Sequence, residues 1–429
     1  MNHKLGKEYS MNGFKKSLVY TLMVFATVFL VSACSSDDYL NAIPEGSTAL
    51  ISVDLPRMAE SKNGIDASLL KALFHVSDAS KCGIDVSSKV YLFESPDGNL
   101  GLAAKIKDAD DLNDQLTELA KKGTCQKPKE KRGKYFTVLN KSWLVGFDDD
   151  ALLVMGPATG SVAQAELMRQ MGKYLDAEEG IKGTPLYDCL QEVDSPIAMV
   201  AQAQALPAQY AALFTLGAPQ NADPSQVLIA ASMTSEAGCL LIDGMTFSFD
   251  ASIDKALKAS VSRFHPVKGL FLNQIPEEAL FSLAMNVDGT DLLQMMKDSK
   301  AFRALLTGVS LSVDMDEFVK AVGGDFIMVL PEPVGEYGDM RWNAELKKPL
   351  ESIDTNHELA KRRMTDGGTS LPKHIADLCK GKRMAMVVNL HGVQDEKREI
   401  VDVITSLLNP LFGEVNYIVC STQVTPVQP

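Results

Sequence analysis

The sequence predicts an α+β fold made of two related units, each a mostly antiparallel sheet with packed helices. Three observations predict it: short apolar runs of strand length end at turn residues, amphipathic helical segments lie irregularly between them, and one seven-residue segment occurs twice. A chain of 429 residues also exceeds what one hydrophobic core usually organises, so we expect more than one domain.

The first domain is expected over residues 44–205. A helix over 68–75 carries apolar residues at helical spacing, and a second helix begins after Asp108 or Asp110 as its N-cap. Turn residues at 95–99 predict a hairpin between two of the strands. Strands are expected at 49–53, 90–93, 100–106, 135–139, 143–147, 151–155 and 197–201.

The second domain is expected over residues 206–429, with a polar excursion at about 332–370. Helices are predicted over 252–261 and 397–411. Strands are expected at 227–233, 239–249, 326–330, 384–390 and 415–420. The final strand–helix–strand run permits a parallel βαβ crossover, although the order of elements as a whole favours α+β.

The repeated segment marks the start of each unit. Residues 39–45 and 271–277 are identical at five of seven positions, and each copy leads into an apolar strand, an amphipathic helix and another strand. Proline suits a strand entrance, because its missing N–H costs no ladder hydrogen bond there and its ring pushes the preceding residue towards extended geometry. We therefore expect the two Ile-Pro pairs at equivalent positions before equivalent strands.

Residues 1–33 are predicted to be a lipoprotein signal peptide whose true start is Met11. Two lysines precede an apolar run over 18–31, which is a little short for a membrane span. The run ends in Val-Ser-Ala before Cys34, which resembles the lipobox of bacterial lipoproteins. That resemblance implies a Cys34 that bears acyl chains such as palmitate and becomes the mature N-terminus. The alternative is an ordinary signal anchor that contains a cysteine.

Residues 34–43 are predicted to form an acylated tether. The lipidation site is followed by Ser35, Ser36, Asp37 and Asp38. The acidic pair is similar to the surface-export signals of Bacteroidetes lipoproteins, and its alternative interpretation is a solvated tether. We expect the protein to be lipid-anchored at the outer membrane, on the cell surface or on the periplasmic face.

Charge narrows the choice of partners. The formal net charge is −13 and the sequence pI is about 5.0, so nucleic acid is excluded as a partner because its phosphates must be met by Lys and Arg. An acidic body is also not drawn to anionic headgroups by its own surface. We therefore expect the membrane to be reached through the lipid on Cys34.

The remaining cysteines give no sign of a metal or redox site. None lies in a CxxC pair or another metal-ligand spacing, and several stand in apolar surroundings. We expect buried free thiols. The six are Cys82, Cys125, Cys189, Cys239, Cys379 and Cys420.

Several short motifs together resemble a family of Bacteroidales envelope lipoproteins known only as a domain of unknown function. They are the lipobox, the run 39–44, the strand that ends at Val53-Asp54, and residues 83–86 before the strand at 90–93. The resemblance implies an envelope lipoprotein. It carries over no catalytic residue, because none is established for the family.

Motifs for catalysis, metal or cofactor binding are missing from the sequence. The six histidines form no HExxH motif, and neither a GxSxG elbow nor a phosphate-binding glycine pattern is present. The Ser-x-x-Lys pairs that begin at Ser68, Ser252 and Ser370 lack the companion motifs of penicillin-binding enzymes. We therefore expect no cofactor and no metal.

The densest group of carboxylates is Asp148-Asp149-Asp150. Its two interpretations are a calcium site, because hard cations prefer oxygen ligands, and a turn between two strands. The turn is favoured, because no EF-hand spacing accompanies the three residues. A glycosidase pair drawn from distant carboxylates has no specific support.

The function that the sequence favours is a non-enzymatic binding or structural module of the envelope. Its candidate partners are an envelope protein or a polysaccharide. The alternative is a surface hydrolase that acts on glycan or peptide. The two are distinguished by whether the fold contains a cleft with convergent polar groups.

The lipid anchor can be tested at its thiol. Cys34→Ser should abolish labelling by an alkyne-tagged fatty acid and block processing of the signal peptide, because acylation needs the sulfur atom. Labelling is measured by in-gel fluorescence, with Cys189→Ser as the matched control. Persistent labelling of Cys34→Ser would disprove the anchor.

Overall fold

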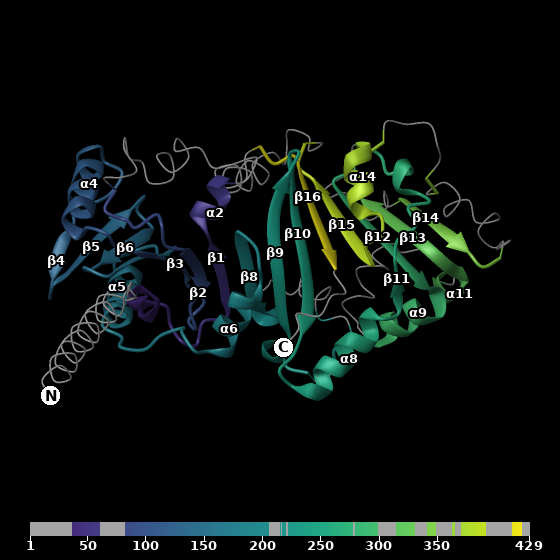
Figure 1. Cartoon of the computed structure of the whole chain (residues 1–429), viewed down its shortest axis with the longest axis horizontal. Helices are drawn as coiled ribbons and strands as arrows, with labels where there is room; N and C mark the ends of the chain where they lie inside the picture. Colours follow the sequence, from purple (N-terminus) through teal and green to yellow (C-terminus); the bar gives the residue numbers. More distant parts are fainter. Residues whose placement is uncertain are drawn as a thin grey trace, which may run out of the picture.

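The computed structural model describes residues 37–60, 82–205, 215, 217–219, 222–277, 279–298, 315–330, 341–348, 363–364, 370–391 and 414–422. These residues form one long, mostly antiparallel sheet with helices on both faces, so the predicted α+β class is confirmed (Figure 1). No helix within these ranges is long and apolar enough to cross a membrane. The helices predicted at 68–75 and 397–411 lie outside the described residues.

The sheet runs the length of the molecule, from β4 at one end to β14 at the other (Figure 1). The order of its described strands is β14-β13-β12-β15-β16-β10-β9-β8-β1-β2-β3-β7-β6-β5-β4, and β11 pairs with β12 outside this path. Within the described sheet, β10 and β16 are the one parallel pair. The strands are β1 (Ala49–Val53), β2 (Val90–Glu94), β3 (Leu100–Lys105), β4 (Lys129–Lys131), β5 (Lys134–Leu139), β6 (Trp143–Phe147), β7 (Ala151–Gly156), β8 (Ile197–Gln202), β9 (Leu228–Glu236), β10 (Cys239–Phe247), β11 (Phe264–His265), β12 (Phe281–Asp288), β13 (Val322–Leu330), β14 (Arg341–Leu346), β15 (Met384–Asn389) and β16 (Tyr417–Thr422).

Helices cover both faces of the sheet, and alternating side chains of each strand meet them. Ala198 and Val200 of β8 belong to the core beneath α6, whereas Ile197 and Met199 point to the opposite face. We name the face that carries α5, α6 and α14 the first face, and the face that carries α2, α4, α8, α9 and α11 the second face. The helices are α2 (Leu55–Glu60), α4 (Ala109–Lys121), α5 (Ser161–Leu175), α6 (Pro185–Glu192), α8 (Ala251–Val261), α9 (Gly289–Asp298), α11 (Met315–Ala321) and α14 (Lys373–Cys379), with 3-10 turns η1 (Asp38–Ala42), η3 (Ala203–Ala205), η4 (Pro224–Gln226) and η5 (Leu272–Gln274).

Two units with the same strand order make up the sheet. One has the order β3-β2-β1-β8-β9 and the other β14-β13-β12-β15-β16, so the central strand of each unit is the one that follows the repeated segment. A helix with a proline at its start precedes the corresponding strands β8 and β15 in each unit. The predicted pair of related units is therefore present in the topology.

The repeated segment adopts the same structure in both units. It forms a 3-10 turn, η1 or η5, that ends at an extended isoleucine. The N–H of Ile43 donates to the carbonyl of Leu40 at 3.1 Å, and the N–H of Ile275 donates to the carbonyl of Leu272 at 3.4 Å. Both isoleucines are fully buried, so each acts as an apolar plug before its strand.

Matching hydrogen bonds lie farther along the two units. The N–H of Gln202 donates to the carbonyl of Thr48 at 2.8 Å, and the N–H of Asn389 donates to the carbonyl of Leu280 at 2.7 Å. The same sequence offset relates Thr48 to Leu280 and Ile43 to Ile275. The duplication therefore extends from the repeated segment to the strand that pairs on its other side.

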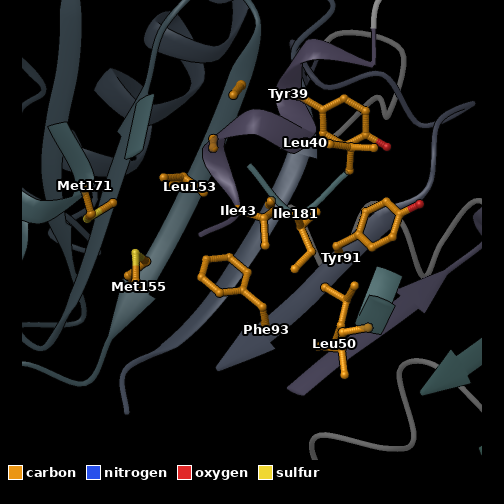
Figure 2. Packing of buried hydrophobic residues seen from close by; sticks show 14 of the residues in the cluster. Tyr39, Leu40, Ile43, Leu50, Tyr91, Phe93, Leu153, Met155, Met171 and Ile181 are labelled. Carbon is orange, nitrogen blue, oxygen red and sulfur yellow. The ribbon is translucent and has the colours of Figure 1, made fainter. Parts of the chain in front are cut away.

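The described end of the predicted tether is part of the core. Tyr39, Leu40 and Ile43 are buried with relative exposures of 3%, 1% and 0%, among side chains of β1, β2 and α5. Figure 2 shows Tyr39 beside Tyr91, with Ile43 close to Phe93. The hydroxyl of Tyr39 donates to the carbonyl of Lys89 at 2.9 Å. The turn η1 places these side chains in the core, and removal of their apolar surface from water stabilises that position.

Other elements differ from the sequence-based expectation. The strands of the second unit follow η5 in the chain. The strands β9 and β10, which open the predicted second domain after residue 206, instead continue the sheet next to β8 of the first unit. The predicted polar excursion contains edge strand β14. The strands β15 and β16 pair antiparallel, so the permitted βαβ crossover is wrong. Local sequence does not specify pairing between strands that lie far apart in the chain.

A buried carboxyl group fixes the approach to η5. Asp325 of β13 has no exposed surface, and its oxygens accept hydrogen bonds from three successive backbone N–H groups of residues 268–270 at 2.7–3.0 Å. The side-chain amide of Asn286 donates a fourth at 2.9 Å. Because the Asp325 carboxyl group is itself out of water, these four donors are the partners that make its burial tolerable.

Removing that acceptor should destabilise the second unit. Asp325→Ala leaves four donors without their partner, and we expect the free energy of unfolding to fall by about 3 kcal/mol. Urea denaturation followed by circular dichroism measures the change. The control is Asp149→Ala at an exposed turn, which should change the free energy by less than about 0.5 kcal/mol. Equal effects of the two substitutions would contradict this role of Asp325.

Candidate ligand-binding cavity

The predicted anchor residues are only partly within the described structure. Cys34, Ser35 and Ser36 lie outside the described residues. Asp37 and Asp38 are exposed, and Asp38 opens η1. The acidic pair is therefore solvent-accessible at the point where the described chain begins.

The Asp148-Asp149-Asp150 run is a turn, as the favoured interpretation predicts. It connects β6 to β7, and the Asp148 carboxylate accepts hydrogen bonds from the N–H groups of Asp150 at 3.0 Å and Ala151 at 2.9 Å. The pKa of Asp150 is raised by partial burial and by the neighbouring carboxylates of Asp148, Asp38 and Asp149. The Oδ1 atom of Asp148 therefore stabilises the turn.

The six cysteines are free thiols, as predicted, and three of them are buried. Burial raises the pKa of Cys239 and Cys379 to about 12 and that of Cys420 to about 11, the last with a contribution from Asp243. These thiols stay protonated at neutral pH, which makes them poor nucleophiles. His265, His374 and His391 are exposed and lie on different elements.

A cavity of about 320 Å³ lies on the second face, where the two units join. Its floor comes from strands of both units, and α8 with the residues just after it forms one wall. Most lining side chains are apolar. The lining residues are Met199, Ile229, Ala231, Ile242, Gly244, Met245, Thr246, Lys258, Ser260, Val261, Ser262, Phe264, Leu283, Arg383, Met384, Met386, Cys420, Ser421 and Thr422.

The placement of the helices explains why this part of the sheet is hollow. On the second face, α2 and α4 cover one unit, while α9 and α11 cover the other. Between them α8 packs at one end of the middle strands, where Leu257 is fully buried against Ile229. Ala231 and Gly244 are paired across β9 and β10, and these small residues leave depth below α8.

Polar groups at the cavity are few, and most are already hydrogen-bonded within the protein. The hydroxyl of Ser260 donates to Met295 Sδ at 3.6 Å and that of Ser262 donates to the carbonyl of Ala259 at 2.7 Å. Ser421 is hydrogen-bonded to Asp243. Of the described residues that line the cavity, none is a histidine or a carboxylate. The hydrogen-bond acceptors of Ser260 and Ser262 are not bases, and Asp243, the acceptor of Ser421, lies outside the lining and is paired with Lys382 at 2.7 Å.

The cavity was not predicted from the sequence, because its residues come from seven strands, one helix and two short connections. A local signal existed in β15, where Met384 and Met386 alternate with the buried Ala385 and Val387. Methionines on one side of a strand indicate an adaptable apolar surface. Without the strand order, this signal does not distinguish a core from a cavity.

A comparison with models of protein families assigns the chain to one family. A family model described as "Domain of unknown function (DUF4836)" matches residues 46–335, which is more than half of the chain. The chain belongs to this family. The prediction of a family of unknown function is thereby confirmed, whereas its Bacteroidales lipoprotein character stays a prediction. No curated protein matches the chain.

Among solved structures, the DUF4836 chain matches crystal forms of TP0453. Form I is 13% identical, and the match covers 53% of this chain and 86% of that chain with a TM-score of 0.32. Form III is 12% identical over 53% and 87%, with a TM-score of 0.32. Form IV is 10% identical over 46% and 76%, with a TM-score of 0.29. Scores this low carry no argument about fold or function.

Proposed function

We propose that this DUF4836 protein is a lipid-anchored envelope protein that binds an apolar ligand in the central cavity without chemical conversion. The observation that carries the proposal is the cavity itself. Its volume of about 320 Å³ lies within the range of small-molecule sites, and it is apolar with a few polar groups at fixed places. Because the packing of both units forms the cavity, every molecule with a complete sheet contains it.

The chemistry of the lining favours binding over hydrolysis. A hydrolase needs an activated nucleophile or paired carboxylates. The described lining holds no carboxylate and no histidine, and Asp243, which accepts from the lining residue Ser421, is itself paired with Lys382. Its thiol, Cys420, has a pKa raised to about 11 by burial and by Asp243, so it stays protonated at neutral pH. We also propose that the outer surface of the protein binds an envelope protein or a polysaccharide. No residues are assigned to that interaction.

Ligand binding can be tested with an environment-sensitive apolar dye. N-phenylnaphthylamine should increase in fluorescence when it enters the cavity of the purified acylated protein in detergent, because its ring leaves water. Met386→Trp places a larger side chain in the cavity and should weaken dye binding by roughly tenfold. Titration of the dye gives the dissociation constants.

The control for the dye experiment is Met168→Trp. Met168 lies on α5, packs against the first-face core and does not line the cavity. This variant should bind the dye as the wild type does, and thermal melts establish that both variants fold. Dye binding that is unchanged in a folded Met386→Trp protein would overturn the proposal.

We also propose that the protein is exposed on the cell surface. The support is the acidic pair Asp37-Asp38, which is solvent-accessible in the structure and follows the predicted lipidation site. Protease treatment of intact cells should then remove the protein, as measured by immunoblot. The matched variant Asp37→Asn with Asp38→Asn should be protected. Protection of the wild-type protein until the outer membrane is opened would place it on the periplasmic side.

A further inference from the structure

The charged residues at the cavity are both cations. Of the described lining residues, Lys258 and Arg383 carry charge, and no aspartate or glutamate lies among them. The chain as a whole has 55 acidic and 42 basic residues. A purely cationic lining therefore runs against the composition of the protein, and it favours an anionic group on whatever occupies the cavity.

Arg383 is held rigidly at the wall of the cavity. Its Nη1 donates hydrogen bonds to two backbone carbonyls, that of Val261 at the end of α8 at 3.0 Å and that of Phe264 in β11 at 3.1 Å. The Nε and Nη2 groups make no hydrogen bond to any other described residue. A half-buried guanidinium with its orientation fixed and two donor groups available fits a carboxylate or a phosphate.

Lys258 lies at the rim of the same cavity on α8. Its Nζ is 2.7 Å from a carboxylate oxygen of Asp254, one turn earlier, and its side chain is 63% exposed. This ion pair is solvated and weak, so the ammonium group can also interact with a second anion. The next basic residue, Lys382, is 2.7 Å from Asp243 and is not part of the lining.

The apolar part of the lining lies below these two cations. Met384 and Met386 of β15, together with Met199 of β8, supply flexible thioether side chains over the floor of the cavity. Unbranched side chains of this kind adapt to a flexible hydrocarbon chain. The cavity thus combines a hydrocarbon-compatible floor with a cationic edge.

We infer that the ligand is an amphiphile, a single acyl chain with an anionic carboxylate or phosphate headgroup, whose head binds Arg383 and Lys258. This inference rests on the proposed ligand-binding function and assigns the chemical class of the ligand. A free fatty acid and a lysophospholipid share this chemistry.

The inference is tested by displacement of the bound dye, with each ionic competitor below its critical micelle concentration and lauryl alcohol below its solubility limit. Laurate, lauryl alcohol and dodecyltrimethylammonium have the same chain length with negative, neutral and positive headgroups. Laurate should displace the dye at roughly tenfold lower concentration than lauryl alcohol, and the cation should be the weakest competitor. Lauroyl lysophosphatidylglycerol, compared with laurate, distinguishes a phospholipid source from a free fatty acid.

Two substitutions assign the headgroup site. Arg383→Gln should remove most of the preference for laurate over lauryl alcohol, and Lys258→Gln should reduce it by about twofold to threefold. Because Arg383 also holds the end of α8, Arg383→Lys keeps the charge and should retain part of the preference. Lys258 is exposed, so Lys258→Gln should fold. This variant tests the inference even if Arg383→Gln does not fold.

The outcomes separate the inference from the proposed function. Equal displacement by the three headgroups in a wild-type protein that binds the dye would overturn the anionic amphiphile and leave apolar ligand binding in place. A preference for laurate that persists in both folded variants would overturn the assignment to Arg383 and Lys258. A wild-type protein that does not bind the dye would overturn the proposed function itself.

Discussion

The parallel pairing of β10 with β16 holds the molecule together. Six consecutive residue pairs, from Cys239 with Tyr417 to Gly244 with Thr422, connect the two units into one sheet. Without these hydrogen bonds each unit would expose an unpaired strand edge at the middle of the protein. The position of the cavity follows from this pairing, because its floor is made of strands on both sides of the connection. The helices of each unit cover their own strands and leave the middle to α8.

Local features were predictable because they depend on neighbouring residues. The turn at Asp148, the N-cap at Asp108, whose carboxylate accepts from the N–H of Asp111, and the strand at 49–53 follow from turn chemistry and periodicity. The repeat was also predictable, since each Ile-Pro pair follows a 3-10 turn and precedes a strand. These are short-range rules, and the chain follows them.

Long-range features were not predictable in the same way. Strand β14 lies in a polar segment, and its position is stabilised by Trp342, which packs edge-on against Phe318 at a ring distance of 4.7 Å. The β10–β16 pairing joins residues that are far apart in the chain, and no property of either strand specifies its partner. The cavity depends on this strand pairing and on the packing of helices over it, and neither can be predicted from one sequence.

The burial of Tyr39 limits the distance between the folded body and the predicted lipidation site at Cys34. Two residues lie between Cys34 and Asp37, and three steps of about 3.3–3.6 Å along a fully extended chain span roughly 10 Å. With lipid on Cys34, such a connection would hold the body against the headgroup region and limit its rotation. A connection this short would keep η1 and the strands packed on it within roughly 10 Å of the lipidated residue.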